Sequence, residues 1–183
     1  QWLAKRKPEL KELFQHYMYG YLADAPKITA TVISTNNKFL GGKAVMKQIA
    51  IDLGPKDCPK IELLLVVPIN RKIQTDRDAP LQVSRPVPVI VGLNFNGNHT
   101  TCADPTIPLP TFPVLQSMDR GGQAHRWPFA LPLRAGIAVA TLCCGQALPD
   151  HADPAVIDGH PGIHRLFGVR FSDRQPHGWS AIA

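Results

Sequence analysis

Apolar residues near the start of the chain recur at three- and four-residue steps, which is the spacing of an amphipathic helix. The segment "PELKELFQHYMYG" (residues 8–20) has one apolar face, which carries Leu10, Leu13, Phe14, Tyr17 and Met18. Pro8 suits the first turn of a helix, and Gly20 can end it. The pattern therefore predicts a helical segment within residues 1–22.

Three strand-like runs follow, at residues 27–34, 42–53 and 60–68. The first two alternate in part between polar and apolar residues, as antiparallel strands with one solvated face do. The third, "KIELLLVVP", is almost continuously apolar and is predicted to lie deeper in the sheet. We therefore expect antiparallel strands within residues 23–86, of which residues 69–86 form a polar loop.

Two later runs are apolar throughout: "VPVIVGLN" (residues 87–94) and "GIAVATLCC" (residues 136–144). Such runs are typical of strands that are buried on both faces of a mainly parallel sheet. A long loop and a predicted helix around "RWPFALPLRAG" lie between them, and Pro132 should kink or shorten that helix. Residues 87–144 therefore predict a right-handed βαβ unit.

The pattern is lost over residues 145–183. A long loop rich in Gly, Pro, His and Asp is predicted first, and "GWSAIA" then has the composition of a helix start. Antiparallel strands, a βαβ unit and the beginning of a further helix indicate about half of an α/β fold. The 183 residues suit a single, incomplete domain.

The charge of the chain does not point to a nucleic-acid or membrane partner. Its formal value is +6, from 20 Lys and Arg against 14 Asp and Glu. The basic residues are scattered, apart from Lys5, Arg6 and Lys7, whereas nucleic-acid-binding proteins show a basic stripe. No apolar run reaches the roughly 18 residues of a membrane helix. The chain opens without a charged-then-apolar leader, so we expect that a signal peptide has been removed or was never present.

The cysteines and histidines do not predict a metal site. Cys58, Cys102, Cys143 and Cys144 include no C-x-x-C pair, and the last two fit the end of a buried strand as small apolar residues. A disulfide from Cys102 to Cys143 or Cys144 is an open alternative. Residues 150–164 hold further possible ligands, namely Asp150, His151, Asp153, Asp158, His160 and His164. A loop of this composition is usually solvated, so we expect no metal and no cofactor.

The chain contains no convincing serine nucleophile. The segment "GWSAI" (residues 178–182) has half of a G-x-S-x-G elbow, but Ile182 replaces the second glycine and no strand precedes Ser180. Ser180 is therefore predicted to be an early helix residue. No elbow surrounds the other serines, which are Ser34, Ser84, Ser117 and Ser172. We expect no catalytic residue within this chain.

Polar residues gather directly after the strand at residues 87–94. They belong to the segment Asn94, Phe95, Asn96, Gly97, Asn98 and His99. In open α/β sheets, ligands bind beyond the carboxyl ends of the strands, and in α/β-hydrolases the loop after the third strand supplies a donor to the oxyanion. The segment is therefore predicted to be an oxyanion-side or cleft loop. The alternative is that its asparagines brace the turn by local hydrogen bonds. Asn98 also begins an N-glycosylation sequon.

Five segments occur together in order: "KRKPELKELFQHYMYG", "FLGGKAVMKQIAI", "PVPVIVGLNFNGNHT", "DRGGQAHRWP" and "RAGIAVATLCCGQALPD". Their order and spacing resemble the bacterial glucuronoyl esterases, which are carbohydrate esterases of the α/β-hydrolase fold. The resemblance covers nearly the whole chain. It departs at "FALPLRAG", where family members often have an acidic residue and no proline. It also departs at Cys143 and Cys144, where aromatic residues are common.

The resemblance implies the N-terminal half of an α/β-hydrolase sheet, truncated before the nucleophile elbow. It implies a secreted or periplasmic serine esterase that cleaves ester links between 4-O-methyl-glucuronate of glucuronoxylan and lignin alcohols. The serine, histidine and acid of the family would lie beyond this chain, so we expect the fragment alone to be inactive. The alternatives are an acetylxylan-esterase-like hydrolase and a non-catalytic carbohydrate-binding module. Because the elbow strand of this fold pairs beside residues 87–94, its absence predicts self-association through an exposed strand edge.

Overall fold

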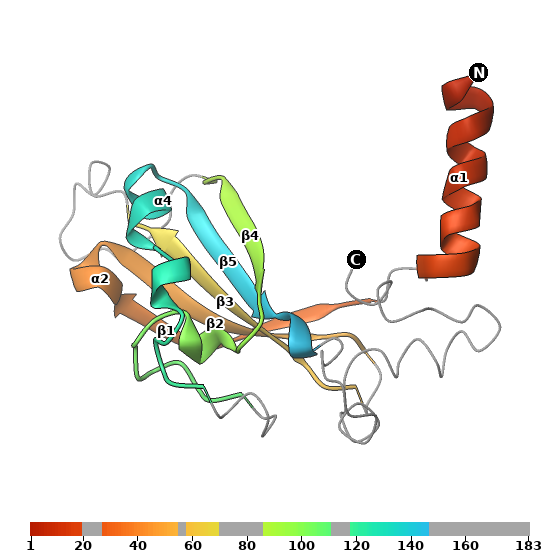
Figure 1. Cartoon of the computed structure of the whole chain (residues 1–183). Helices are drawn as coiled ribbons and strands as arrows, with labels where there is room; N and C mark the ends of the chain where they lie inside the picture. The colour runs from red at the N-terminus through yellow and green to blue at the C-terminus, as the bar shows by residue number, and fades with distance from the viewer. Residues whose placement is uncertain (20–26, 55–57, 70–85, 111–117, 147–183) are drawn as a thin grey trace. The chain divides into compact units, whose positions relative to one another are not determined.

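The computed structural model describes residues 1–19, 27–54, 58–69, 86–110 and 118–146 (Figure 1). The chain divides into two compact units. The first contains Gln1–Thr29, Asp52–Lys60 and Cys144–Ala183, and the second contains Ala30–Ile51 and Ile61–Cys143. Most of the sheet and the whole candidate site lie in the second unit.

The first unit begins with a continuous helical run. It consists of η1 (Trp2–Arg6), α1 (Lys7–Phe14) and η2 (Gln15–Tyr19). The helical run therefore starts earlier than the predicted start at Pro8. Leu13, Phe14 and Tyr17 of the predicted apolar face are exposed by 44, 51 and 75%. The periodicity of the sequence thus predicts the helix, but these side chains are not buried in the structure.

The strands form a five-stranded sheet in the order β1–β2–β3–β5–β4. Their bounds are β1 (Thr29–Lys38), β2 (Ala44–Asp52), β3 (Ile61–Pro68), β4 (Val89–Asn94) and β5 (Ala138–Cys143). β3 pairs antiparallel with β2 and with β5, whereas β4 and β5 are parallel. The predicted arrangement, antiparallel first strands followed by a βαβ unit, is confirmed.

Short elements connect the strands, and β1 differs in length from the prediction. The connections include α2 (Phe39–Gly42), η4 (Asn98–Thr100), η5 (Ala124–Arg126) and α4 (Ala130–Arg134), and η6 (Cys144–Gln146) follows β5. β1 continues to Lys38, beyond the predicted residues 27–34. The sequence does not mark this end, because the side chains of β1 are mostly exposed and show no apolar alternation there. The crossover helix α4 has five residues and contains Pro132, so the predicted shortening is confirmed.

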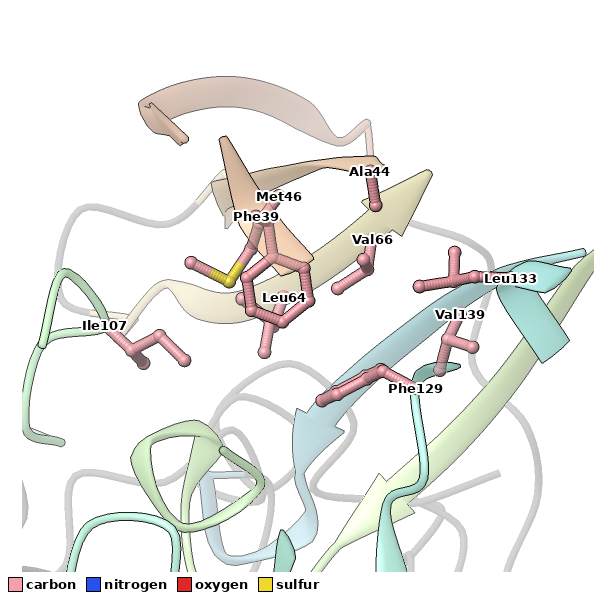
Figure 2. Close-up of a cluster of buried hydrophobic side chains, with 9 residues drawn as sticks. All are labelled: Phe39, Ala44, Met46, Leu64, Val66, Ile107, Phe129, Leu133 and Val139. Atoms are coloured by element: carbon pink, nitrogen blue, oxygen red, sulfur yellow. The ribbon is translucent and has the colours of Figure 1, made fainter. Parts of the chain in front are cut away.

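One face of the sheet carries the hydrophobic core (Figure 2). Side chains alternate along a strand and paired residues point to the same face, so Met46, Val66 and Val139 lie together. The residues that cover them from the connections are Phe39, Ile107, Phe129 and Leu133. Burial of each large side chain stabilises the fold by about 1.5–3 kcal/mol. The core therefore holds the β4–β5 crossover against this face of the sheet.

β4 is the last strand of the sheet in the described part of the chain. Val89, Ile90, Val91 and Leu93 are exposed by 49, 51, 64 and 42%. The prediction that residues 87–94 are buried on both faces is therefore wrong for this structure, because the described residues leave these side chains largely uncovered. Within the described residues β4 is therefore an apolar edge strand, and self-association through this edge stays a prediction.

Candidate functional site

The candidate site is the loop that leaves the carboxyl end of β4. Asn94 is the last residue of the strand and pairs with Cys143 of β5. Because the two strands are parallel, their carboxyl ends lie at one edge of the sheet, where α/β folds bind ligands. The chain then turns through Gly97, whose φ and ψ are 91° and 152°, into η4. These dihedral angles are almost restricted to glycine, so Gly97 makes the turn possible.

Side-chain hydrogen bonds attach the loop to two strands. The Nδ2 atom of Asn98 donates to the carbonyl O of Glu62 in β3 at 2.8 Å. The Nδ2 atom of Asn94 donates to Oδ1 of Asn98 at 2.8 Å and to Oγ1 of Thr141 in β5 at 3.0 Å. Asn94 and Thr141 are buried. The Oδ1 atom of Asn94 is also buried and has no hydrogen-bond partner among the described residues.

The imidazole of His99 is fully buried within the same loop. Its Nε2 atom lies 3.0 Å from the carbonyl O of Met118, and because a carbonyl only accepts, Nε2 carries the hydrogen. Its Nδ1 atom has no partner in the described part of the chain. A Cβ atom at Gly97 would lie 2.8 Å from Nδ1. The missing side chain of Gly97 therefore leaves room for the buried ring.

Local hydrogen bonds close the turn. The backbone N and the Oγ1 atom of Thr100 both donate to the carbonyl O of Gly97, at 3.1 and 2.8 Å. Thr101 makes the same pair of bonds to the carbonyl O of Asn98, at 3.2 and 2.7 Å. The backbone N–H groups of Gly121 and Gln123 donate to the carbonyl O atoms of His99 and Thr100, at 3.0 and 2.9 Å. Hydrogen bonds thus brace the turn, which is one of the two roles predicted for its polar residues.

Some backbone donors of the loop remain unused. The N–H groups of Phe95, Asn96 and Gly97 make no hydrogen bond to any residue that the structure describes. They follow one another directly at the carboxyl end of β4. Unpaired N–H groups at this edge of the sheet are available to bind a carbonyl oxygen or an anion.

Glu62 brings an ionisable group next to the loop. It lies at the start of β3, at the same edge of the sheet as the end of β5, since Leu63 pairs with Leu142. Burial raises the pKa of the Glu62 carboxyl group above its ordinary value of 4.5. This carboxyl group therefore keeps its proton to a higher pH than an exposed glutamate does.

The segment after the loop is fixed by a second set of hydrogen bonds. Arg120 Nη1 donates to the carbonyl groups of Asp104 and Ile107 at 2.9 and 2.6 Å. Asn36 Nδ2 donates to Oδ2 of Asp104 at 3.0 Å. In this segment, burial is the largest effect on the Cys102 thiol and raises its pKa above the ordinary 9.0. Cys102 therefore lacks the lowered pKa of a catalytic thiol.

The structure brings together all the residues of the predicted loop, from Asn94 to His99. Their partners were not predicted from the sequence. Thr141 is the polar exception in the apolar run "GIAVATLCC", a signal that could have identified it. The carbonyl groups of Glu62 and Met118 have no such signal, because every residue carries a carbonyl group.

Several other predicted features lie outside the described residues, namely Ser180 and the possible metal ligands at residues 150–164. Within the described ranges, no three His, Cys, Asp or Glu side chains form a potential metal-binding group. No helix in the described part of the chain has the length and apolar character needed to cross a membrane. The four cysteines, all of which the structure describes, form no disulfide. Asn98, the asparagine of the sequon, is half-buried, and its Nδ2 atom, to which a glycan would be attached, donates to the carbonyl O of Glu62.

Known carbohydrate esterases are similar to this chain. Carbohydrate esterase MZ0003, from an unknown prokaryotic organism, is 33% identical over 168 residues, which cover 85% of this chain and 36% of that protein. Two solved structures of the glucuronoyl esterase from Solibacter usitatus are 34% identical with a TM-score of 0.69, over 91% of this chain and 41% of theirs. No family model matches the chain. The resemblance to glucuronoyl esterases and the partial α/β-hydrolase fold are thus confirmed, and the chain spans well under half the length of these relatives.

Proposed function

We propose that this chain is the N-terminal part of a serine carboxylic-ester hydrolase. Its substrate would be the ester between 4-O-methyl-glucuronate of xylan and lignin alcohols. The observation that carries the proposal is the 34% identity to the Solibacter usitatus glucuronoyl esterase over 91% of this chain. That match covers 41% of the esterase, so a full-length protein of this kind has room for the serine, histidine and acid. The enzyme would be secreted or periplasmic, where a polymeric plant substrate is accessible.

In this proposal, the loop from Asn94 to His99 lies on the oxyanion side of the active site. Attack of a serine hydroxyl on the ester carbonyl creates a tetrahedral intermediate with a negatively charged oxygen. Backbone N–H groups that are already free of protein acceptors stabilise such an oxygen without rearrangement. The unpaired N–H groups of Phe95, Asn96 and Gly97 support this role. The serine and its base would come from sequence beyond this chain.

A chimera tests the proposed reaction. The segment of the Solibacter usitatus esterase to which this chain is similar would be replaced by this chain of 183 residues. We expect the chimera to hydrolyse a benzyl ester of 4-O-methyl-glucuronate, and the 183-residue chain alone to be inactive. Hydrolysis by the chain alone that is abolished by Ser180→Ala would contradict the assignment of the serine to another part of the protein.

The same assay separates the alternatives. Faster hydrolysis of acetylxylan than of the glucuronate ester by the chimera would favour an acetylxylan-esterase-like enzyme. A folded chimera that binds glucuronoxylan but hydrolyses neither ester would favour a carbohydrate-binding module. Because the chimera contains the relative's own serine, the unmodified Solibacter usitatus esterase is the control for each rate.

The outer edge of β4, which pairs with no further strand among the described residues, supports a second, physical proposal, which is self-association of the chain when it is isolated. The backbone N of Ala138 donates to the carbonyl O of Pro88. In a parallel ladder alternate residues face the same neighbour, so the N–H and C=O groups of Val89, Val91 and Leu93 point away from β5. Their side chains are apolar, and no charge or proline interrupts the strand between them. Such an edge favours pairing with a second copy.

A further inference from the structure

The side chain of Asn98 has a position that distinguishes it from the other asparagines of the loop. It is half-buried, and both of its polar atoms are used: Nδ2 bonds to the carbonyl O of Glu62, and Oδ1 accepts from Asn94. Asn94 in turn bonds to Thr141. One residue of the loop thus connects the end of β4, the start of β3 and the end of β5.

The chemistry of these groups leaves one orientation for both amides. The carbonyl O of Glu62 can only accept, so the atom of Asn98 beside it must be the NH₂ group. The oxygen of Asn98 then faces Asn94, and Asn94 must present its own NH₂ group. A single main-chain carbonyl group in β3 therefore determines the direction of two side chains in the loop.

This connection fixes the two ends of the segment with unpaired donors. Asn94 precedes Phe95, Asn96 and Gly97, and Asn98 follows them. The hydrogen bond between the side chains of Asn94 and Asn98 is 2.8 Å long and joins the residues on either side of these three. Their N–H groups have no acceptor within the described residues. The direction of these donors therefore depends on how the residues on either side of them are held, and the bond between Asn94 and Asn98 joins those two residues.

We propose that Asn98 is a positioning residue, which aims the N–H groups of Phe95, Asn96 and Gly97 through its bonds to Glu62 and Asn94. The proposal rests on the proposed esterase function for its catalytic purpose. A bracing role alone would be met by the four bonds that Thr100 and Thr101 make to the same turn. The bonds of Asn98 differ from these because they set the loop relative to the sheet.

The first test uses the 183-residue chain alone. NMR would follow the side-chain NH₂ signals of Asn94 and the backbone amides of residues 95–97 in Asn98→Ala and Asn98→Asp. We expect faster exchange of the Asn94 NH₂ protons with D₂O, and altered amide shifts at residues 95–97, in both variants. Asn98→Ala removes the bonds to Glu62 and Asn94 without placing a charged oxygen against a carbonyl group. It therefore keeps the test possible if Asn98→Asp does not fold. The controls are Asn37→Ala and Asn37→Asp, the same changes at an exposed asparagine of β1.

The second test measures kinetics in the chimera. A positioning role lowers kcat by about a hundredfold in Asn98→Ala and leaves KM unchanged, because misdirected donors act in the transition state. The Asn37→Ala chimera should keep both constants.

The positioning role, its catalytic purpose and the proposed function are each contradicted by a different result. Unchanged NH₂ and amide signals in Asn98→Ala overturn the positioning role, whatever the chimera does. Altered signals together with an unchanged kcat overturn its catalytic purpose. An inactive unsubstituted chimera overturns the proposed function instead.

Discussion

Replacement of Gly97 by alanine should destabilise the protein through two separate effects. The first is backbone strain, because φ 91° and ψ 152° lie in a region that side chains disfavour by about 1–3 kcal/mol. The second is a collision. A Cβ atom would lie 2.8 Å from Nδ1 and 3.0 Å from Cε1 of His99, whose ring is fully buried and bonded to Met118. Overpacking of a buried site costs about 1–3 kcal/mol. The expected total for Gly97→Ala is therefore about 2–6 kcal/mol, a large fraction of an ordinary folding free energy.

Two other glycines separate these effects. Gly136 has φ 76° but nothing within 4 Å of a Cβ atom, so Gly136→Ala measures strain without collision and should cost about 1–2 kcal/mol. At Gly92 no positive φ occurs, and a Cβ atom would lie 3.0 Å from Cη2 of Trp127. Since Trp127 is only half-buried and can shift, Gly92→Ala should cost about 1 kcal/mol.

The assay is urea unfolding of each variant, followed by circular dichroism at one protein concentration. The change in the free energy of unfolding follows from the midpoint and the slope of each curve. We expect the loss for Gly97→Ala to exceed that for Gly136→Ala and that for Gly92→Ala. A loss no larger than that of Gly136→Ala would refute the reasoning, because the imidazole of His99 would then be free to move aside.

Three further predictions follow from individual residues. Glu62→Gln should stabilise the chain at pH 7. The pKa of Glu62 is raised above 4.5, so the stability linked to its proton is present below pH 4.5 and is lost as pH rises through the folded-state pKa. The unfolding midpoints of Glu62→Gln and of the parent should converge at low pH. A difference between them that stays constant with pH would contradict the raised pKa of Glu62. Val91→Lys should abolish self-association in light scattering, whereas Val32→Lys on the opposite edge strand should not; equal effects would exclude the β4 edge. Cys102 should react more slowly with a thiol reagent in the folded than in the urea-unfolded chain, as peptide mass spectrometry would show, because burial raises its pKa.

The sequence predicts best the strands whose burial leaves an apolar pattern. β2, β3 and β5 carry buried residues at the core face, and their bounds lie within two residues of the predicted runs. β1 is mostly exposed, so its end at Lys38 has no apolar signal. For β4 the pattern of a fully buried strand is present, but burial depends on other elements that cover both faces of the strand. The composition of the strand cannot show whether those elements are in place.

The polar loop was located from the sequence, but its internal order was not. The partner of Asn98 lies 36 residues away, in β3, and the partner of Asn94 lies 47 residues away, in β5. Both become neighbours only after the sheet has formed. Local rules for turns therefore predict that the asparagines make hydrogen bonds, and cannot predict which oxygen or nitrogen each one presents.

The distribution of unpaired groups is the strongest argument that the loop is more than a braced turn. Thr100 and Thr101 use both their backbone and their side-chain donors in this turn. By contrast, Oδ1 of Asn94, Nδ1 of His99 and the N–H groups of residues 95–97 have no partner among the described residues. A buried polar atom without a partner costs about 1–3 kcal/mol, and local conflicts of this kind are expected at functional sites. A loop that served only to connect β4 to the crossover would not need unpaired buried polar atoms at the edge of the sheet where ligands bind.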